Sequence, residues 1–209
     1  MTEYLIPAGY GEAELTEKRS RFIGHVWPIE SEEEALEHIK ELKSKYWDAR
    51  HNVYAYILRE GGIMRYSDDG EPQGTSGMPT LNVFRGEEIN NVCCVVTRYF
   101  GGILLGTGGL VRAYSSTAKL ALEAAGVSVV RLWKRFFVDC SYSQFERMKK
   151  EIEGFDAVIE EIDYGASVGI SALVPEEKAE AFQLRITDVS AGTIVPEPLG
   201  EEERAVRIK

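Results

Sequence analysis

The chain has 209 residues, of which 44% are hydrophobic and 28% charged, and its formal net charge is −10. This composition is ordinary for a globular protein with a real core, and the length predicts one large domain or two small ones. Residues 1–130 carry 13 basic and 18 acidic side chains and residues 131–209 carry 11 and 16, so each part has a net charge of −5. Neither part is a basic nucleic-acid-binding domain by bulk charge, and any polyanion must bind a local patch.

The first fifteen residues lack the basic segment and apolar run of a signal peptide. No apolar stretch approaches the ~20 residues of a membrane helix, so we expect a cytoplasmic protein. Residues 31–47 predict the first helix, because Ser31 and Glu34 form a capping box and apolar residues recur at helical spacing. The residues expected on the core face of this helix are Leu36, Ile39, Leu42 or Lys43, and Tyr46.

Residues 52–59, 62–67, 80–84 and 91–100 are rich in Val, Ile, Tyr and Phe, which predicts four strands. The first two are expected to form a hairpin through Glu60, Gly61 and Gly62. A second long helix is predicted from about Gly108 to Ala125, and Gly126 suits its end.

The pattern then restarts with a strand at 132–142 and a helix ending at Gly154. A hairpin turning at Tyr164 and Gly165, a helix over 176–190 and a last strand over 192–200 follow. This βαββαβ order is typical of the ferredoxin-like arrangement, and the whole chain is predicted to be α+β. We place the domains at 1–130 and 131–209.

Residues 101–109, here called the glycine loop, hold five glycines between a strand and a helix: Gly101, Gly102, Gly106, Gly108 and Gly109. Thr107 and Gly108 stand where a P-loop needs lysine and serine or threonine, and Val111 breaks a GxGxxG motif, so neither nucleotide motif is present. Two interpretations stay open. In the first interpretation, the loop amides, together with Arg98 and Arg112, bind phosphate at the helix N-terminus. Alternatively, glycine only permits close packing of the helix on the strand, and both arginines form surface ion pairs.

The segment SDDGEPQGTSGMPTL, residues 67–81, predicts a polar loop around a turn at Asp68, Asp69 and Gly70. Asp68, Asp69 and Glu71 either pair with Arg50, Arg98 or Arg112 or hold a hydrated magnesium ion, and the turn is favoured. His51, with Asp48 or Asp68 and a nearby Ser67, Thr75 or Ser76, can also be written as a hydrolytic triad. The motif of a nucleophile elbow is absent, which favours His51 as a hydrogen-bonded anchor.

Four stretches together resemble one family: KRSRFIGHV, DARHNVYAYIL, SDDGEPQGTSGMPTL and TRYFGGILLGTGGLVRAYSSTAKLAL. They resemble the IMPACT family in its bacterial two-domain form, the YigZ/YvyE type. The resemblance implies an N-terminal domain with the fold of ribosomal protein S5 domain 2 and a ferredoxin-like C-terminal domain similar to domain V of elongation factor G. Eukaryotic members regulate translation through a stress-kinase pathway and carry an RWD domain, for which residues 1–17 are too few.

The resemblance thus predicts a translation-linked protein that binds RNA, the ribosome or a translation factor through a cleft at the glycine loop. The alternative is a small-molecule phosphotransferase or hydrolase that uses the same cleft. We expect no catalytic residue, metal or cofactor. The predicted ligand-binding residues are Arg50, His51, Asp68, Asp69, Glu71, Arg98, Gly101, Gly102, Gly106, Thr107, Gly108 and Arg112.

Overall fold

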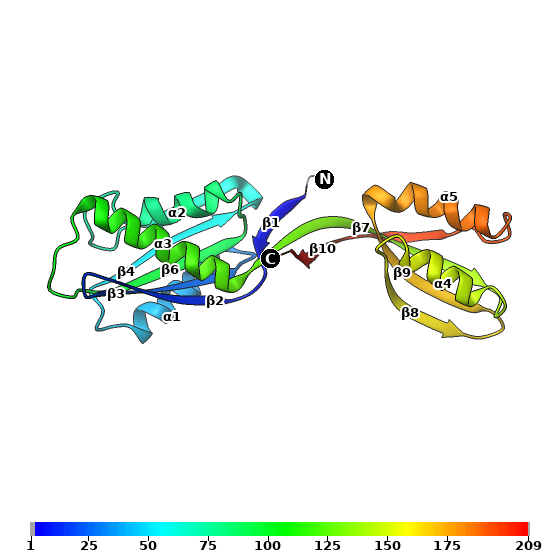
Figure 1. Cartoon of the computed structure of the whole chain (residues 1–209), viewed down its shortest axis with the longest axis horizontal. Coiled ribbons are helices and arrows are strands. Elements are labelled where there is room, and N and C mark those ends of the chain that lie inside the picture. Colours follow the sequence, from blue (N-terminus) through cyan, green and yellow to red (C-terminus); the bar gives the residue numbers. More distant parts are fainter. Residues whose placement is uncertain (1–2, 209) are drawn as a thin grey trace. The chain divides into compact units, whose positions relative to one another are not determined.

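The computed structural model describes residues 3–208, which form two compact units (Figure 1). Among the described residues, the N-terminal unit contains Tyr4–Val129 and residues 205–208, and the C-terminal unit contains Glu3 and Val130–Arg204. This division lies one residue from the predicted boundary. The C-terminal end of the chain returns to the N-terminal unit, where the Ile208 amide donates to the Val127 carbonyl at 2.8 Å. Among the helices of residues 3–208, none has the length and hydrophobicity of a membrane span.

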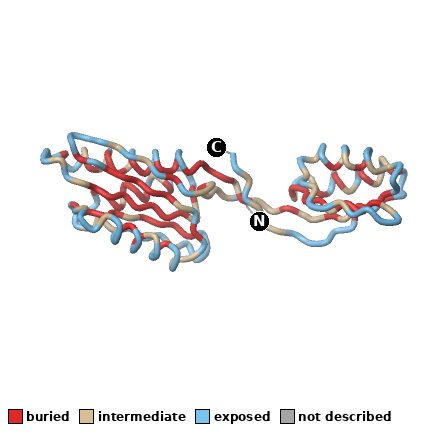
Figure 2. The backbone as a smooth tube through the Cα atoms, turned by 90° about the horizontal axis from the view of Figure 1, so that it is seen from below, coloured by how far each residue is buried: buried red, intermediate tan, exposed pale blue. Residues whose placement is uncertain are grey.

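The N-terminal unit is a five-stranded antiparallel sheet between two layers of helix (Figure 2). Its elements are β1 (Tyr4–Pro7), β2 (Gly11–Glu17), β3 (Ser20–Pro28), α1 (Glu32–Lys45), β4 (His51–Leu58), β5 (Ile63–Ser67), α2 (Gly77–Gly86), β6 (Val92–Tyr99) and α3 (Thr107–Ala125). The strand order is β2-β3-β6-β4-β5. Helices α2 and α3 cover one face of the sheet, and α1 covers the other (Figure 1).

Helix α1 begins as the sequence predicts. The Ser31 hydroxyl accepts the Glu34 amide at 3.2 Å, and the Glu34 carboxylate accepts the Glu30 amide at 2.8 Å. The buried face includes Ile39 and Leu42 as expected, but Leu36 is 52% exposed and Ala35 takes its place in the core. The predicted β4–β5 hairpin, strand β6 and helix α3 are also present.

The predicted strand at residues 80–84 is wrong, because these residues belong to helix α2. Asp68 accepts the main-chain amides of Ser76 and Gly77, which satisfies donors at the start of the helix. Pro79 lies in the first turn, where its missing N–H costs little. Leu81 and Phe84 are buried beneath the helix, so tertiary packing overrides their moderate strand preference.

Strands β1, β2 and β3 are not among the predicted elements. The turn between β2 and β3 is made by Lys18 and Arg19, whose φ angles are 43° and 67°. Glycine usually marks such a turn, and its absence removed the local signal. Strand β3 nevertheless lies inside the sheet, where Phe22 is fully buried and packs edge-to-face on Tyr114 of α3 with ring centroids 5.2 Å apart.

The C-terminal unit has the predicted βαββαβ order. Its elements are β7 (Val127–Cys140), α4 (Phe145–Glu153), β8 (Val158–Tyr164), β9 (Val168–Pro175), α5 (Ala179–Val189) and β10 (Glu197–Arg207). Strand β7 pairs with β10 and β9, and β9 also pairs with β8. The last strand starts later than predicted, since the Ser190 hydroxyl accepts the Ile194 amide and so holds this segment at the end of α5.

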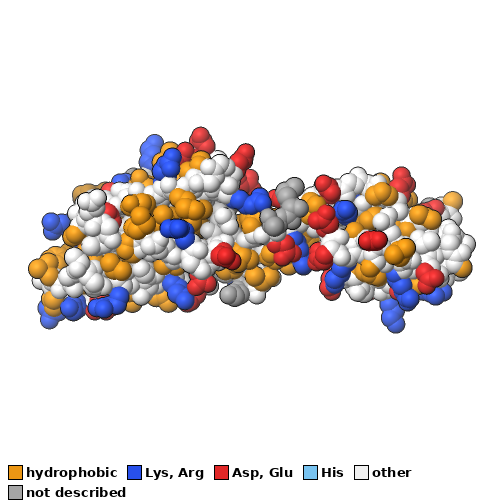
Figure 3. Space-filling model, turned by 90° about the horizontal axis from the view of Figure 1, so that it is seen from above, with side chains coloured by type: hydrophobic (Ala, Val, Ile, Leu, Met, Phe, Trp, Pro, Cys, Tyr) orange, Lys and Arg blue, Asp and Glu red, His pale blue; other side chains and the backbone are white. Residues whose placement is uncertain are grey.

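Lys and Arg side chains are interspersed with Asp and Glu on the face of each unit that Figure 3 shows. Arg131, Lys134 and Arg135 form a basic run at the start of the C-terminal unit, and each lies within 4 Å of a glutamate carboxylate. Arg131 pairs with Glu177 at 3.2 Å, and Arg135 pairs with both Glu160 and Glu202. This run therefore offers no free patch for a polyanion.

Candidate functional site

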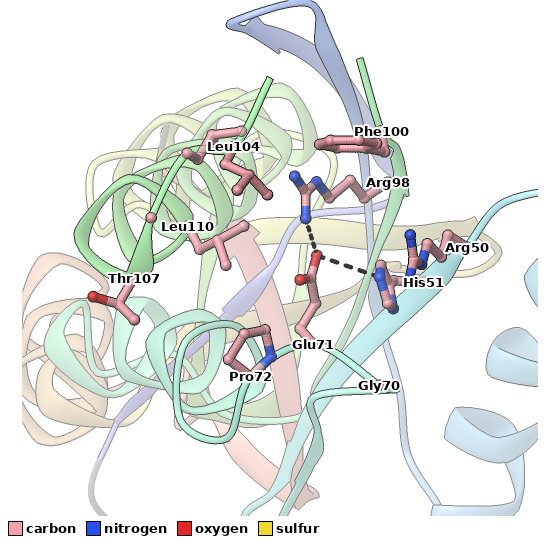
Figure 4. A pocket seen from close by; sticks show the side chains of 12 residues that line it. Arg50, His51, Gly70, Glu71, Pro72, Arg98, Phe100, Leu104, Thr107 and Leu110 are labelled. Atoms are coloured by element: carbon pink, nitrogen blue, oxygen red, sulfur yellow. Dashed lines mark hydrogen bonds and ion pairs between the residues drawn. The ribbon is translucent and has the colours of Figure 1, made fainter. Parts of the chain in front are cut away.

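A cleft of about 460 Å³ opens in the N-terminal unit beside the glycine loop (Figure 4). Its walls come from the start of β4, the loop after β5, the end of β6 and the loop that leads into α3. The lining residues are Arg50, His51, Gly70, Glu71, Pro72, Arg98, Phe100, Leu104, Leu105, Gly106, Thr107 and Leu110. The family resemblance predicted a cleft at the glycine loop, and six of the twelve predicted ligand-binding residues line this cleft: Arg50, His51, Glu71, Arg98, Gly106 and Thr107.

A buried ion pair forms the floor of this cleft. Glu71 and Arg98 are 9% and 5% exposed, and an Arg98 Nη1–H donates to the Glu71 Oε1 atom at 2.5 Å. The Tyr114 hydroxyl donates to the same oxygen at 2.8 Å. Burial, followed by the Glu71 charge, raises the pKa of Tyr114 far above its ordinary value, so its hydroxyl stays protonated. The interpretation of Arg98 as a surface ion pair is therefore wrong.

Arg98 keeps unused donors despite this pair. Its Nε–H is buried without a hydrogen-bond partner, and its Nη2 reaches only the Ser20 hydroxyl, at 3.4 Å. The guanidinium carbon also lies 5.4 Å and 5.5 Å from the ring centroids of Phe22 and Phe100. A buried donor without a partner is costly, and a group that lent this N–H an acceptor would remove the cost.

His51 faces the same floor from strand β4. Its Nδ1 lies 2.8 Å from the Asp69 carbonyl oxygen, which can only accept, so Nδ1 carries the proton. In the neutral ring Nε2 is therefore an acceptor, and it lies 3.9 Å from Glu71 Oε1. The candidate triad does not assemble, because the Ser76 hydroxyl donates to Asp68 and Asp48 accepts the Tyr99 hydroxyl.

Asp68 and Asp69 do not line the cleft but build the loop behind it. Asp68 accepts the amides of Gly74, Ser76 and Gly77 and the Ser76 hydroxyl. Asp69 accepts the Asn52 amide at 2.7 Å and Lys43 Nζ at 2.8 Å. These contacts support the turn interpretation over ligand binding for both carboxylates. Across residues 3–208, no group of three or more His, Cys, Asp or Glu side chains could hold a metal ion.

Replacing Asp68 with Asn should destabilise the protein by about 1–2 kcal/mol at neutral pH, because the Asn side-chain NH2 group, a donor, would stand where a carboxylate oxygen now accepts main-chain N–H groups. Burial alone would raise the pKa of Asp68, but its hydrogen bonds lower it overall below the ordinary 3.8. A carboxylate whose pKa is lower in the folded state stabilises the protein at pH values above its unfolded-state pKa. This stabilisation is lost as the pH falls through the folded-state pKa. The difference from wild type should therefore shrink below about pH 3.8, as urea melts at several pH values would measure. A difference in unfolding free energy that stays the same at every pH would contradict this prediction.

The five glycines of the loop serve different purposes. A Cβ on Gly101 would lie 2.0 Å from the Arg19 carbonyl carbon, so the chain passes too closely for any side chain. Gly102 and Gly106 have φ angles of 84° and 73°, which other residues rarely adopt. A Cβ on Gly109 would meet the Leu105 side chain at 2.9 Å. Gly108 is exposed, and an added Cβ would meet nothing within 4 Å, so close packing does not explain it.

Helix α3 starts without a side-chain cap. Gly106 is its N-cap residue and makes no side-chain hydrogen bond, and Gly106 and Thr107 both line the cleft. The free amides of this first turn and the helix dipole favour an anion. Arg50, an exposed residue, lies at the cleft on the side opposite Thr107 (Figure 4).

Arg112 is exposed on α3 and does not contribute to the lining, in contrast to its predicted role beside the phosphate. Six lining residues were absent from the predicted ligand-binding set: Gly70, Pro72, Phe100, Leu104, Leu105 and Leu110. Ser20 and Tyr114, which contact Arg98 and Glu71 on the floor, were absent as well. Tyr114 and Leu110 carried a signal, since both fall at apolar positions spaced four residues apart in the predicted second helix. Ser20 carried none, because the turn before β3 has no glycine.

Comparisons with known proteins identify the family. The Impact N-terminal domain matches residues 18–122, and a domain of unknown function (DUF1949) matches residues 138–193. The IMPACT family member YvyE of Bacillus subtilis is 37% identical over 183 residues, which cover 87% of this chain and 84% of the relative. The IMPACT family member YigZ of Escherichia coli is 32% identical over 197 residues, covering 93% of this chain and 97% of the relative.

A crystal structure of a hypothetical protein is similar over the full length. It covers 100% of this chain and 98% of that chain, with 30% sequence identity and a TM-score of 0.60. Both halves of the chain thus have counterparts in the same order in related proteins. The chain belongs to the IMPACT family, in its bacterial two-domain form.

Proposed function

We propose that this chain is a translation-linked binding protein whose N-terminal cleft holds a phosphate-bearing ligand, of which RNA is the leading candidate. The link to translation rests on the family resemblance and on the proposed likeness of the units to S5 domain 2 and to domain V of elongation factor G. The βαββαβ order of the C-terminal unit supports the second likeness. A likeness of fold is a weak basis for function, so the cleft carries the chemical part of the proposal.

The observation that carries the proposal is the uncapped N-terminus of α3, which lines the same cleft as Arg98 with its buried and unpartnered Nε–H. Helix N-termini bind phosphate through free amides and the positive end of the dipole. The Glu71 carboxylate neutralises Arg98 on the floor and repels anions. The phosphate therefore sits at the rim, against the first turn of α3, and the uncharged part of the ligand reaches the floor.

Gly108→Asp tests this arrangement. The new side chain has open space, and a carboxylate in the first turn of a helix is favourable by about 0.3–1 kcal/mol, so the protein should keep or gain stability. The carboxylate would also repel an incoming phosphate, so binding of a short single-stranded RNA at low salt should be lost. Thermal melts and fluorescence anisotropy with labelled RNA measure the two effects.

Gly108→Ala is the matched control, because it adds the same Cβ without charge. It should bind RNA normally and be stabilised by about 0.4–1 kcal/mol, since alanine restricts the unfolded chain. If Gly108→Asp is folded and binds RNA as tightly as Gly108→Ala does, the phosphate does not lie at this helix terminus and the proposal fails.

A further inference from the structure

We infer that the floor of the cleft recognises the Watson–Crick edge of one unpaired guanine. The inference rests on the proposed function, since it assigns the uncharged part of the same phosphate-bearing ligand. Three polar side chains form the floor in the spatial order Arg98, Glu71, His51 (Figure 4). Arg98 contacts Glu71 at 2.5 Å, and Glu71 lies 3.9 Å from His51 Nε2.

The hydrogen-bonding roles of the three groups are fixed by their other contacts. Arg98 is a donor only, with a buried Nε–H still free. Glu71 is ionised beside Arg98 and accepts two bonds through Oε1, which leaves Oε2 to accept from a ligand. His51 donates through Nδ1 to the Asp69 carbonyl, so its Nε2 accepts. The floor therefore presents a donor, an acceptor and a second acceptor.

Guanine is the base that complements this order. Its Watson–Crick edge offers the O6 acceptor, the N1–H donor and the N2 amino donor. Adenine places an amino donor beside a ring acceptor, cytosine offers one donor and two acceptors, and uracil places its second carbonyl against the His51 lone pair. Single-stranded RNA is recognised in this manner, by hydrogen bonds to the edges of unpaired bases.

The remaining lining suits a single nucleotide. A volume of about 460 Å³ lies in the range of small-molecule sites, roughly 300–1,000 Å³, and is too small for a duplex. Phe100 is 42% exposed at the cleft and offers an aromatic face for stacking, and Leu105 and Leu110 add apolar surface. The base edge must be unpaired, because a cytosine partner would occupy the same donors and acceptors.

The test compares nucleotides that differ in single groups, by calorimetry on the full chain. GMP should bind about tenfold more tightly than IMP, which lacks only the N2 amino group, and more tightly still than AMP. His51→Ala should bring the affinity for GMP down to that for IMP and leave IMP unchanged. Arg112→Ala, an exposed residue outside the lining, is the control and should bind GMP normally. Circular dichroism checks that each variant is folded.

Guanosine and single-stranded hexamers with one G or one A identify the source of the base. Preference for the G hexamer over GMP indicates RNA, and the reverse indicates a free nucleotide; either supports the inference. The guanine inference is overturned if GMP, IMP and AMP bind with equal affinity, or if His51→Ala lowers the affinities for GMP and IMP equally. The phosphate proposal stands in both cases. Guanosine binding as tightly as GMP supports guanine recognition and overturns the phosphate proposal. If no nucleotide, nucleoside or hexamer binds, both are wrong.

Discussion

Replacing Arg98 with Met should lower the free energy of unfolding by about 3–5 kcal/mol, because the change leaves the Glu71 carboxylate buried without its cation. Glu71 is 9% exposed, and after the substitution only the Tyr114 hydroxyl would still donate to it among the contacts on the floor. Such a loss is a large share of the 5–15 kcal/mol that stabilise an ordinary domain. Urea denaturation followed by circular dichroism measures it.

Two comparison variants separate the buried charge from other effects. Arg21→Met breaks the exposed pair between Arg21 and Glu14, at 2.7 Å, and should change stability little. The double variant Arg98→Met with Glu71→Leu removes both charges and should recover part of the loss. If Arg98→Met is as stable as Arg21→Met, then Glu71 is protonated or hydrated and the floor is not a buried ion pair.

Replacing Gly101 with Ala should be the most damaging single methyl addition in the glycine loop. The new Cβ would lie 2.0 Å from the Arg19 carbonyl carbon and 2.5 Å from the Ser20 amide nitrogen, both of which are main-chain atoms. The Ser20 hydroxyl also accepts the Gly101 amide at 3.1 Å, so the loop cannot move away without losing this bond. Overpacking of this kind costs about 1–3 kcal/mol or more.

Thermal melts of Gly101→Ala and Gly108→Ala make a matched pair, since each adds one methyl group to the same loop. The first should melt at a lower temperature than wild type and the second at an equal or higher one. Ligand affinity should fall in Gly101→Ala as well, because Ser20 joins this loop to Arg98. Equal melting temperatures for the two variants would show that the loop relaxes freely around Arg19.

Local signals in the sequence were sufficient for several elements. Ser31 and Glu34 marked the start of α1, because capping depends on residues only three positions apart. The glycines at 61 and 62 marked the β4–β5 hairpin, and alternating strands and helices gave the order of the C-terminal unit. The same local reasoning found six of the cleft residues, since they lie at the end of β6, in the loop after β5, or at the starts of β4 and α3.

Only the tertiary structure decided the rest. Residues 80–84 have strand-forming side chains, yet Asp68 holds the start of a helix there and the core buries its face. Strand β3 carries no turn signal before it, but its pairing with β2 and β6 fixes its place in the sheet.

The chemistry of the cleft depends on pairs that are distant in sequence. Arg98 meets Glu71 across 27 residues and Ser20 across 78. Gly101 and Gly108 look alike in the sequence, but one touches a neighbouring main chain and the other faces open space. Composition and spacing could name these residues as candidates. Which of them are buried, paired or free is set by long-range packing, because burial and ion pairing depend on what the fold brings beside each side chain.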